Sequence, residues 1–86
     1  MRELEKKLKA LANRRRLAIL AYLKKEREAT VGEIAREINL SFKATSKHLG
    51  ILSAVDILEK DQRSLQMFYR FCSNQAPAVR HILSIL

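Results

Sequence analysis

Apolar residues recur at helical spacing along most of the chain. Three leucines at this spacing predict a helix over residues 3–11 with one apolar side. Asn13 is a good N-cap for a second helix, which is expected from Arg14 to about Lys25. The interior of this second helix, LAILAYL, is apolar almost all round, which predicts that it is the central buried helix.

Two short helices are predicted over residues 30–54, separated by a two-residue step that begins at Asn39. Thr30 and Glu33 form an S/T-x-x-E capping box that opens the first of them. Asn39 suits the left-handed residue that ends this helix, and Ser41 offers its hydroxyl as the N-cap of the next. Two helices joined by so short a turn predict a helix-turn-helix, which places its second helix in the DNA major groove.

A period of two over residues 65–72 predicts a β-strand. One face of this strand is predicted to hold Leu65, Met67, Tyr69 and Phe71. Residues 57–60 predict a partner strand, and the polar turn residues 61–64 join the two into a β-hairpin. A very short extended piece is also expected around Ala29 and Thr30.

Residues 74–86 predict a last helix with a broad apolar surface. Ser73 or Asn74 is expected to cap it, and Pro77 is acceptable in its first turn. The elements therefore follow the order helix-helix-helix-helix-hairpin-helix in a single domain of residues 1–86. This layout is mainly α with a small β-hairpin, and it is that of a winged helix-turn-helix.

The second helix of the predicted helix-turn-helix divides its residues between two faces. Thr45, Leu49 and Leu52 share the face that can pack on the first helix. The opposite face has two cations, a hydroxyl, an aromatic ring, a glycine and no acid: Phe42, Lys43, Ser46, Lys47 and Gly50. Lysine can reach a phosphate or a guanine edge, and serine can bond to several groups. A plain solvated helix face is the alternative, but such a face more often mixes both signs of charge.

The net charge of +8 suggests a polyanion as partner. The excess lies mostly in residues 1–25, which hold nine Lys or Arg against two Glu, and the remainder is nearly balanced. Charge therefore supports nucleic-acid binding without locating the site. Three arginines at positions 14–16 oppose the dipole of the second helix, which favours an external anion or an internal acid as their partner.

Several classes of protein are disfavoured by what the sequence lacks. No stretch approaches the roughly 20 apolar residues of a membrane span, and the first residues contain no apolar signal core. The single cysteine, Cys72, fits a reducing compartment and is expected to be a structural buried thiol, so we expect a cytoplasmic protein. With two histidines, no glycine-rich phosphate loop and no nucleophile–base pair at recognisable spacing, the chain is predicted not to be an enzyme.

Three segments resemble the ArsR-type (arsenic repressor-like) transcriptional regulators. LANRRRLAILAYL, residues 11–23, resembles their opening pattern, with Asn13 in place of the usual acid and Arg14 in place of the usual proline. VGEIAREINLSFKATSKHLGIL, residues 31–52, resembles their helix-turn-helix, and QMFYRF, residues 66–71, resembles their second wing strand. The resemblance implies a homodimer built on its first and last helices, which acts mostly as a repressor that covers a promoter.

The chain departs from the metal-sensing members of that family. Those members carry a cysteine pair around the start of the third helix, where this chain has Thr30-Val31-Gly32-Glu33. A second family site uses Asp and His on the last helix, which here offers only His81. We therefore expect no metal and no other cofactor.

The candidate DNA-contacting residues lie on the recognition helix, the hairpin and the second helix. They are Ser41, Phe42, Lys43, Thr45, Ser46, Lys47, His48, Gln62, Arg63 and Arg16. Phe42 is expected either against a base methyl or over the helix-turn-helix core, and His48 either as a phosphate donor or as a structural histidine. Arg16 is expected to face a phosphate or to pair with Glu33 or Glu37.

The candidate dimer interface is apolar and combines the two terminal helices. It comprises Leu4, Leu8, Leu11, Val79, Ile82, Leu83 and Leu86, with packing on the protein's own core as the alternative. The sequence as a whole predicts a homodimeric, sequence-specific regulator that binds double-stranded DNA. The alternative is a protein-interaction module that keeps the winged-helix scaffold and does not bind DNA.

Overall fold

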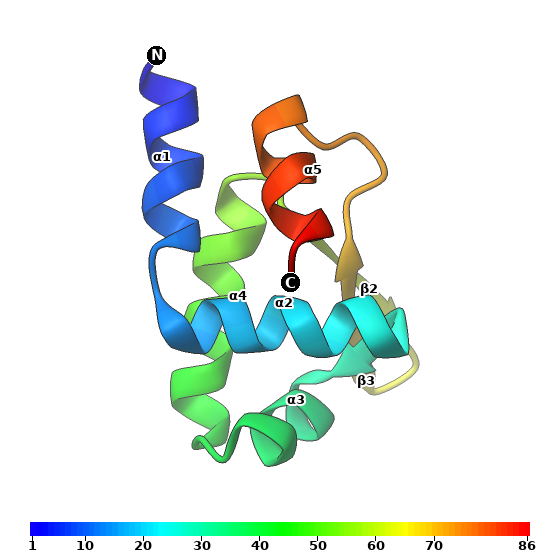
Figure 1. The fold of residues 1–86 in the computed structure, drawn as a ribbon. Helices are drawn as coiled ribbons and strands as arrows, with labels where there is room; N and C mark the ends of the chain where they lie inside the picture. Colours follow the sequence, from blue (N-terminus) through cyan, green and yellow to red (C-terminus); the bar gives the residue numbers. More distant parts are fainter.

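The computed structural model describes all 86 residues and has five helices and a three-stranded antiparallel sheet (Figure 1). The elements are α1 (Arg2–Leu11), α2 (Arg14–Glu26), β1 (Glu28–Thr30), α3 (Val31–Ile38), α4 (Phe42–Ala54), β2 (Leu58–Arg63), β3 (Gln66–Phe71) and α5 (Pro77–Ser84). This is the predicted winged helix-turn-helix, in which α3 and α4 form the helix-turn-helix and the β2–β3 hairpin forms the wing.

The predicted central helix is α2, which crosses the molecule with α1 and α5 on one side and α3 on the other (Figure 1). Ile19, Leu20 and Leu23 of α2 are completely buried. They belong to one core cluster that also receives residues from every other helix and from the three strands. No helix has the length and apolar character that crossing a membrane requires.

The short-range signals at the helix ends act as the sequence predicts. The side chain of Asn13 accepts two backbone N–H bonds from the first turn of α2, at 2.9 and 3.0 Å. Thr30 and Glu33 form the reciprocal capping box of α3. Asn39 ends α3 in the left-handed conformation with φ 56°, and Ser41 caps α4. These local contacts fix the angle between α3 and α4, because they define where one helix stops and the next starts.

The hairpin is longer and its tip tighter than predicted. The ladder continues to the pair Arg63–Gln66, so only Ser64 and Leu65 form the turn, with Ser64 at φ 57°. Leu65 is therefore 97% exposed at the tip, and the prediction that it belongs to the second strand, on one face with Met67, Tyr69 and Phe71, is wrong. The extended piece expected near Ala29 is β1, which pairs with β3 and completes the sheet in the order β1-β3-β2.

The predicted cap of the last helix is also wrong. α5 begins at Pro77 after Ala76, and no side chain caps it, so Ser73 and Asn74 lie in the preceding loop. Gln75 instead holds this loop, because its Nε2 donates to two carbonyl oxygens of the chain, at 2.8 and 3.0 Å. At the other end of α5, Nζ of Lys24 donates to three carbonyl oxygens, which ties the helix to α2.

Candidate nucleic-acid interface

The outward face of α4 is positively charged, and its one side-chain hydrogen bond within the chain is the cap in which the hydroxyl of Ser41 accepts from the backbone N–H of Ala44. Ser41, Phe42, Lys43 and Lys47 are exposed, and Ser46 is partly exposed. Neither lysine takes part in any of the ion pairs of the structure. The face therefore presents two free cations and two hydroxyl groups on a rigid helix, which can bind phosphates and base edges.

Thr45 does not belong to this face, so its place among the predicted DNA contacts is corrected. Its side chain is completely buried, because positions 45, 49 and 52 recur at helical spacing on the side of α4 that packs against the core. Its Oγ1 has no hydrogen-bond partner. Thr45 thus fills the core.

Phe42 stands at the start of α4 and is 63% exposed. It lines an open hollow of about 320 Å³ between the start of α3, the start of α4 and the wing tip. The other lining residues are Thr30, Val31, Gly32, Leu65, Gln66 and Met67. A side chain so exposed does not serve mainly as a cover for the core, and its contact with a base methyl stays a prediction.

Arg16 joins three elements instead of pairing with the acids of α3. Its Nε donates to the carbonyl oxygen of Ala10 at 2.6 Å, and Nη2 lies 3.4 Å from the carbonyl oxygen of Lys9. Nη1 lies 3.1 Å from Nδ1 of His48 on α4. The predicted pairing with Glu33 or Glu37 is wrong, because the guanidinium is used on His48 and on carbonyl oxygens at the end of α1, which attract a cation.

His48 is half-buried at the edge of α4. Burial lowers its pKa below the ordinary value of 6.5, and the nearby charges of Arg16, Arg15 and Lys47 lower it further. The contact with Arg16 gives His48 a structural role, while its second ring nitrogen forms no hydrogen bond within the chain.

Arg63, the cation next to the wing tip, is paired with acids of the same sheet. Arg63 donates to both carboxylate oxygens of Glu28 at 2.7 Å and to Asp61 at 3.0 Å, and it lies 4.4 Å above the ring centre of Phe68. These contacts raise the pKa of Arg63 and lower the pKa values of both carboxyl groups. The exposed tip therefore offers mainly neutral side chains, those of Gln62, Ser64, Leu65 and Gln66.

The predicted dimer surface separates into exposed and buried residues. Leu4, Leu8 and Leu86 are partly exposed, and Leu4 and Leu8 line an apolar hollow of about 330 Å³ along α1. Ile82 and Leu83 pack on the edge of the core. Leu11 and Val79 are buried in the protomer itself, so their assignment to an interface is corrected. Ile85, which also belongs to the predicted apolar surface of the last helix, is 73% exposed just after α5.

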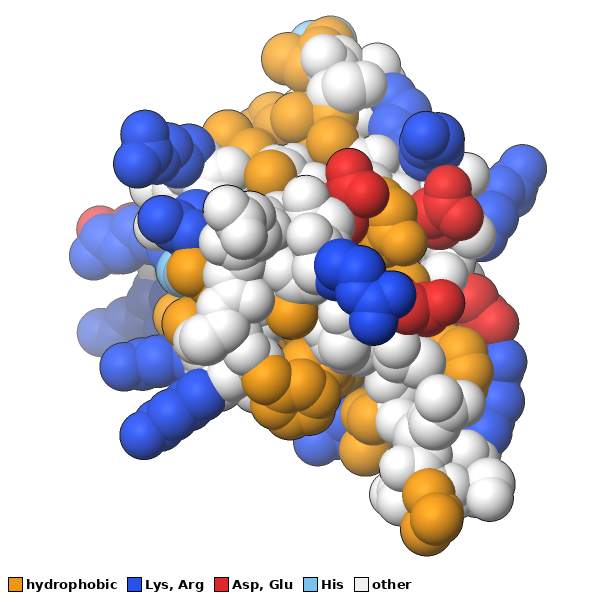
Figure 2. Space-filling model, turned by 90° about the horizontal axis from the view of Figure 1, so that it is seen from below, with side chains coloured by type: hydrophobic (Ala, Val, Ile, Leu, Met, Phe, Trp, Pro, Cys, Tyr) orange, Lys and Arg blue, Asp and Glu red, His pale blue; other side chains and the backbone are white.

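Charge is distributed unevenly over the surface. On the face seen in Figure 2, Lys and Arg side chains project along one flank, whereas acidic side chains gather on the other half among further cations.

No group of three or more His, Cys, Asp or Glu side chains could hold a metal ion. Cys72 is a free, half-buried thiol whose pKa is raised, chiefly by burial.

The sequence profile of a family described as "Helix-turn-helix domain" matches residues 11–61 of the chain. The chain belongs to this family. It is also 36% identical over 76 residues to the transcriptional activator HlyU of Vibrio cholerae, a match that spans 88% of this chain and 69% of that protein. Over 79 residues the chain is 38% identical to the nodulation protein NolR of Rhizobium meliloti. This match spans 92% of the chain and 62% of NolR.

Solved structures extend this family relationship to the fold. Reduced HlyU from Vibrio cholerae superposes with a TM-score of 0.82 at 31% identity. The match covers 98% of this chain and 84% of the HlyU chain. A second solved structure is a homodimeric winged helix-turn-helix DNA-binding domain from Mycobacterium bovis, described as a possible ArsR-family regulator. It superposes with a TM-score of 0.82 at 26% identity, and the match covers 96% of this chain and 73% of that chain. The resemblance of the sequence to ArsR-type regulators is confirmed.

Proposed function

We propose that this chain is a sequence-specific regulator of transcription that binds double-stranded DNA as a homodimer. The observation that carries the proposal is the outward face of α4, where Lys43 and Lys47 flank Ser46 without an acid or an internal partner. The family and the named relatives support it, since HlyU is a transcriptional activator and the Mycobacterium bovis neighbour is a DNA-binding domain. The function is one of binding, not of catalysis.

In this proposal, α4 enters the major groove, which is wide enough to admit one helix. Lys47 contacts a phosphate, whereas Lys43 and Ser46 reach base edges. A homodimer would place two such helices about one helical turn apart, or roughly 34 Å, on a nearly palindromic site. The exposed leucines of α1 and the end of α5 would form the interface, and the Mycobacterium bovis domain is described as homodimeric.

We propose repression as the mode of action, because a dimer bound across a promoter blocks access to the DNA that it covers. The relatives do not share one mode: HlyU is named an activator, and AntR an antimony-specific repressor. Transcription from a promoter that carries the selected binding site, measured with and without the protein, distinguishes the two modes.

The decisive test of DNA binding is a salt titration. The dissociation constant for a mixed-sequence duplex is measured by fluorescence anisotropy between about 50 and 300 mM salt. Phosphate contacts release counterions, so the logarithm of the affinity should fall linearly and steeply with the logarithm of salt concentration. Absent or salt-insensitive binding would reject the proposal and favour the protein-interaction module.

A further inference from the structure

We infer that Arg14 and Arg15, at the start of α2, form a second binding site for the DNA backbone beside the recognition helix. The inference rests on the proposed function and adds to it two residues that lie outside both the helix-turn-helix and the wing. The ligand is a phosphate diester of the duplex that flanks the groove occupied by α4.

The three consecutive arginines of α2 have different surroundings. Arg16 uses its guanidinium inside the protein, on carbonyl oxygens of α1 and on His48. Arg14 and Arg15 take part in no ion pair, and their guanidinium groups donate no hydrogen bond within the chain. Of the two partners that the sequence allows for these cations, the structure provides no internal acid, so an external anion remains.

The position of these two cations costs stability within the protein. The N-terminal turn of a helix carries a partial positive charge, so cations there are unfavourable unless something outside the helix compensates them. α2 has no acid in its first turn. A local arrangement that opposes folding without an internal compensation is expected at functional sites.

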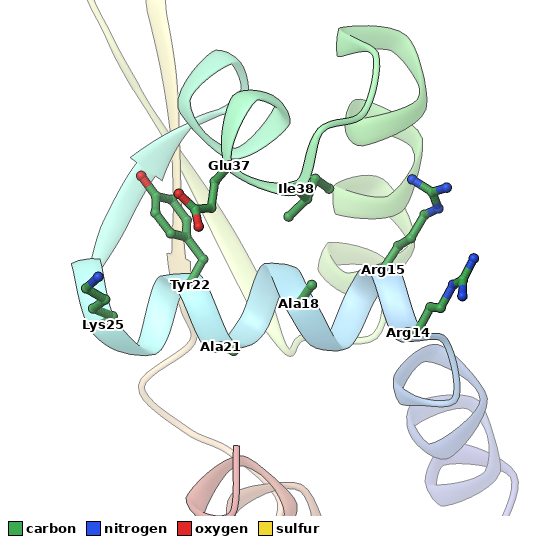
Figure 3. Close-up of a pocket in the computed structure, with 8 residues that line it drawn as sticks. All are labelled: Arg14, Arg15, Ala18, Ala21, Tyr22, Lys25, Glu37 and Ile38. Atoms are coloured by element: carbon green, nitrogen blue, oxygen red, sulfur yellow. The ribbon is translucent and has the colours of Figure 1, made fainter.

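The start of α2 lies beside the recognition helix. The contact between Arg16 and His48 holds the first turn of α2 against the middle of α4. Figure 3 shows the side chains of Arg14 and Arg15 extending from this end of α2, away from Tyr22 and Glu37. Both guanidinium groups are thus presented at the flank of the helix-turn-helix, where a DNA strand that borders the major groove would pass.

The two ends of the open groove along α2 differ in charge. It has a volume of about 610 Å³, with Arg14 and Arg15 at one end and Tyr22, Glu37 and Lys25 toward the other (Figure 3). Burial raises the pKa of Tyr22, and the charges of Glu26, Glu33 and Glu37 raise it further. No acid lines the arginine end, whereas Glu37 offsets Lys25 at the other end, so a polyanion is attracted more strongly to the arginine end.

The test compares two double variants of the full chain that lose the same charge. Arg14→Gln/Arg15→Gln removes the proposed site, and Lys25→Gln/Arg27→Gln removes two cations at the opposite end of the same helix. Affinity for a mixed-sequence 30-base-pair duplex is measured by fluorescence anisotropy across the salt range. Each lost phosphate contact lowers the salt slope by about 0.9, so the first variant should lose about 1.8 from its slope and bind about 30-fold more weakly near 0.15 M salt.

Three outcomes are distinguishable. If the wild type binds with a steep salt slope and only the arginine variant loses part of it, the second site is supported. If the wild type binds but both variants change equally or the arginine variant not at all, this inference is overturned and the proposed function stands. If the wild type shows no salt-dependent binding, the proposed function itself fails.

Two controls separate this inference from unfolding and from a small-anion site. Because the two arginines oppose the helix dipole, their replacement should leave the thermal midpoint of unfolding unchanged or higher. The same protein is titrated calorimetrically with decanoate, an amphipathic carboxylate. Decanoate binding that Arg14→Gln/Arg15→Gln abolishes, while DNA affinity stays intact, would overturn the inference and assign the groove to a small ligand.

Discussion

Nη1 of Arg16 lies 3.1 Å from Nδ1 of His48, and this contact links the end of α1 and the start of α2 to the recognition helix. A guanidinium can only donate, so Nδ1 accepts and His48 carries its proton on Nε2. The imidazole is therefore neutral in this arrangement, and its Nε2–H is left to face solvent or a phosphate. One side chain thus couples the expected dimer helix to the helix that would enter DNA.

Replacing Arg16 should destabilise the whole domain. Arg16→Ala removes three contacts and leaves the carbonyl oxygen of Ala10 at the end of α1 without a donor, so the free energy of unfolding should fall by about 1–3 kcal/mol. Urea denaturation measures the change. Arg14→Ala is the matched control, because Arg14 has no partner within the chain, and it should leave stability equal or slightly higher. Equal stability of the two variants would contradict the structural role of Arg16.

The lowered pKa of His48 predicts a dependence of stability on mildly acidic pH. The unfolded chain, with its histidine near the ordinary value of 6.5, binds a proton before the folded chain does. The free energy of unfolding is therefore highest above pH 6.5 and should fall as the pH drops from 6.5 toward the folded pKa. His48→Gln should flatten the curve between pH 7.5 and 5.5, measured by urea denaturation. An unchanged slope would show that His48 does not carry this effect.

The three polar residues of the α4 face should differ in their effect on DNA binding: one should set the affinity, and the other two the sequence preference. Lys47→Ala should weaken binding to all duplexes alike if Lys47 contacts phosphate, whereas Lys43→Ala or Ser46→Ala should alter which sequences are preferred. Each base contact is worth about 1–3 kcal/mol of discrimination. Selection from a random duplex pool, followed by sequencing, measures both effects. Unchanged preference and affinity in all three variants would remove α4 from the interface.

The ion pairs of the wing should be lost in acid. Glu28 and Asp61 have pKa values lowered first by hydrogen bonds from Arg63, so their contribution to stability is present above the unfolded carboxyl range near pH 4 and disappears as the pH falls through the folded values. Arg63→Ala should raise both carboxyl pKa values and speed amide exchange in β2 and β3. NMR titration and hydrogen exchange measure these changes.

The same variant tests whether the wing contributes charge to DNA binding. Since Arg63 is already paired, Arg63→Ala should leave the salt slope of duplex binding close to that of the wild type. Lys60→Ala serves as a control, because Lys60 is an exposed cation of β2 without an ion pair. A slope reduced only by Arg63→Ala would show that Arg63 leaves Glu28 to contact a phosphate.

Much of the fold is readable from sequence because its decisive signals are local. The capping box at Thr30, the left-handed Asn39 and the N-cap Ser41 act within four residues of themselves, and each lies where the sequence predicts it. The partners of Arg16 and Arg63 are not local. Arg63 reaches Glu28 across 35 positions, through a sheet whose register no short motif determines.

The assignment of apolar positions shows the same limit. Helical spacing predicts that Leu8 and Leu11 share one side of α1, but it does not tell which of them another helix of the same chain covers. In the structure Leu11 is buried by the core, whereas Leu8 is 42% exposed. Thr45 is the converse case, because a polar residue type suggests a surface contact while its helical position makes it part of the core.

The contrast between exposed and buried apolar residues gives a test of the dimer. Leu8→Glu places a charge in the apolar hollow along α1 and should convert a dimer to monomers, while each monomer stays folded because Leu8 is outside the core. Sedimentation equilibrium measures the mass, and circular dichroism measures the fold. Val79→Ala should instead affect the fold of the protomer, because the core cavity it leaves should lower the free energy of unfolding by roughly 1–3 kcal/mol.

Leu65→Glu is the matched control for Leu8→Glu, because it introduces the same charge at an exposed leucine between β2 and β3, and these strands lie on the other side of the molecule from α1 (Figure 1). It should remain dimeric. Dissociation by both glutamate variants would point to a general charge effect, and a Leu8→Glu protein that stays dimeric would remove α1 from the interface. Because two half-sites bound together reinforce each other, loss of the dimer should also weaken binding to a palindromic duplex far more than binding to a single half-site.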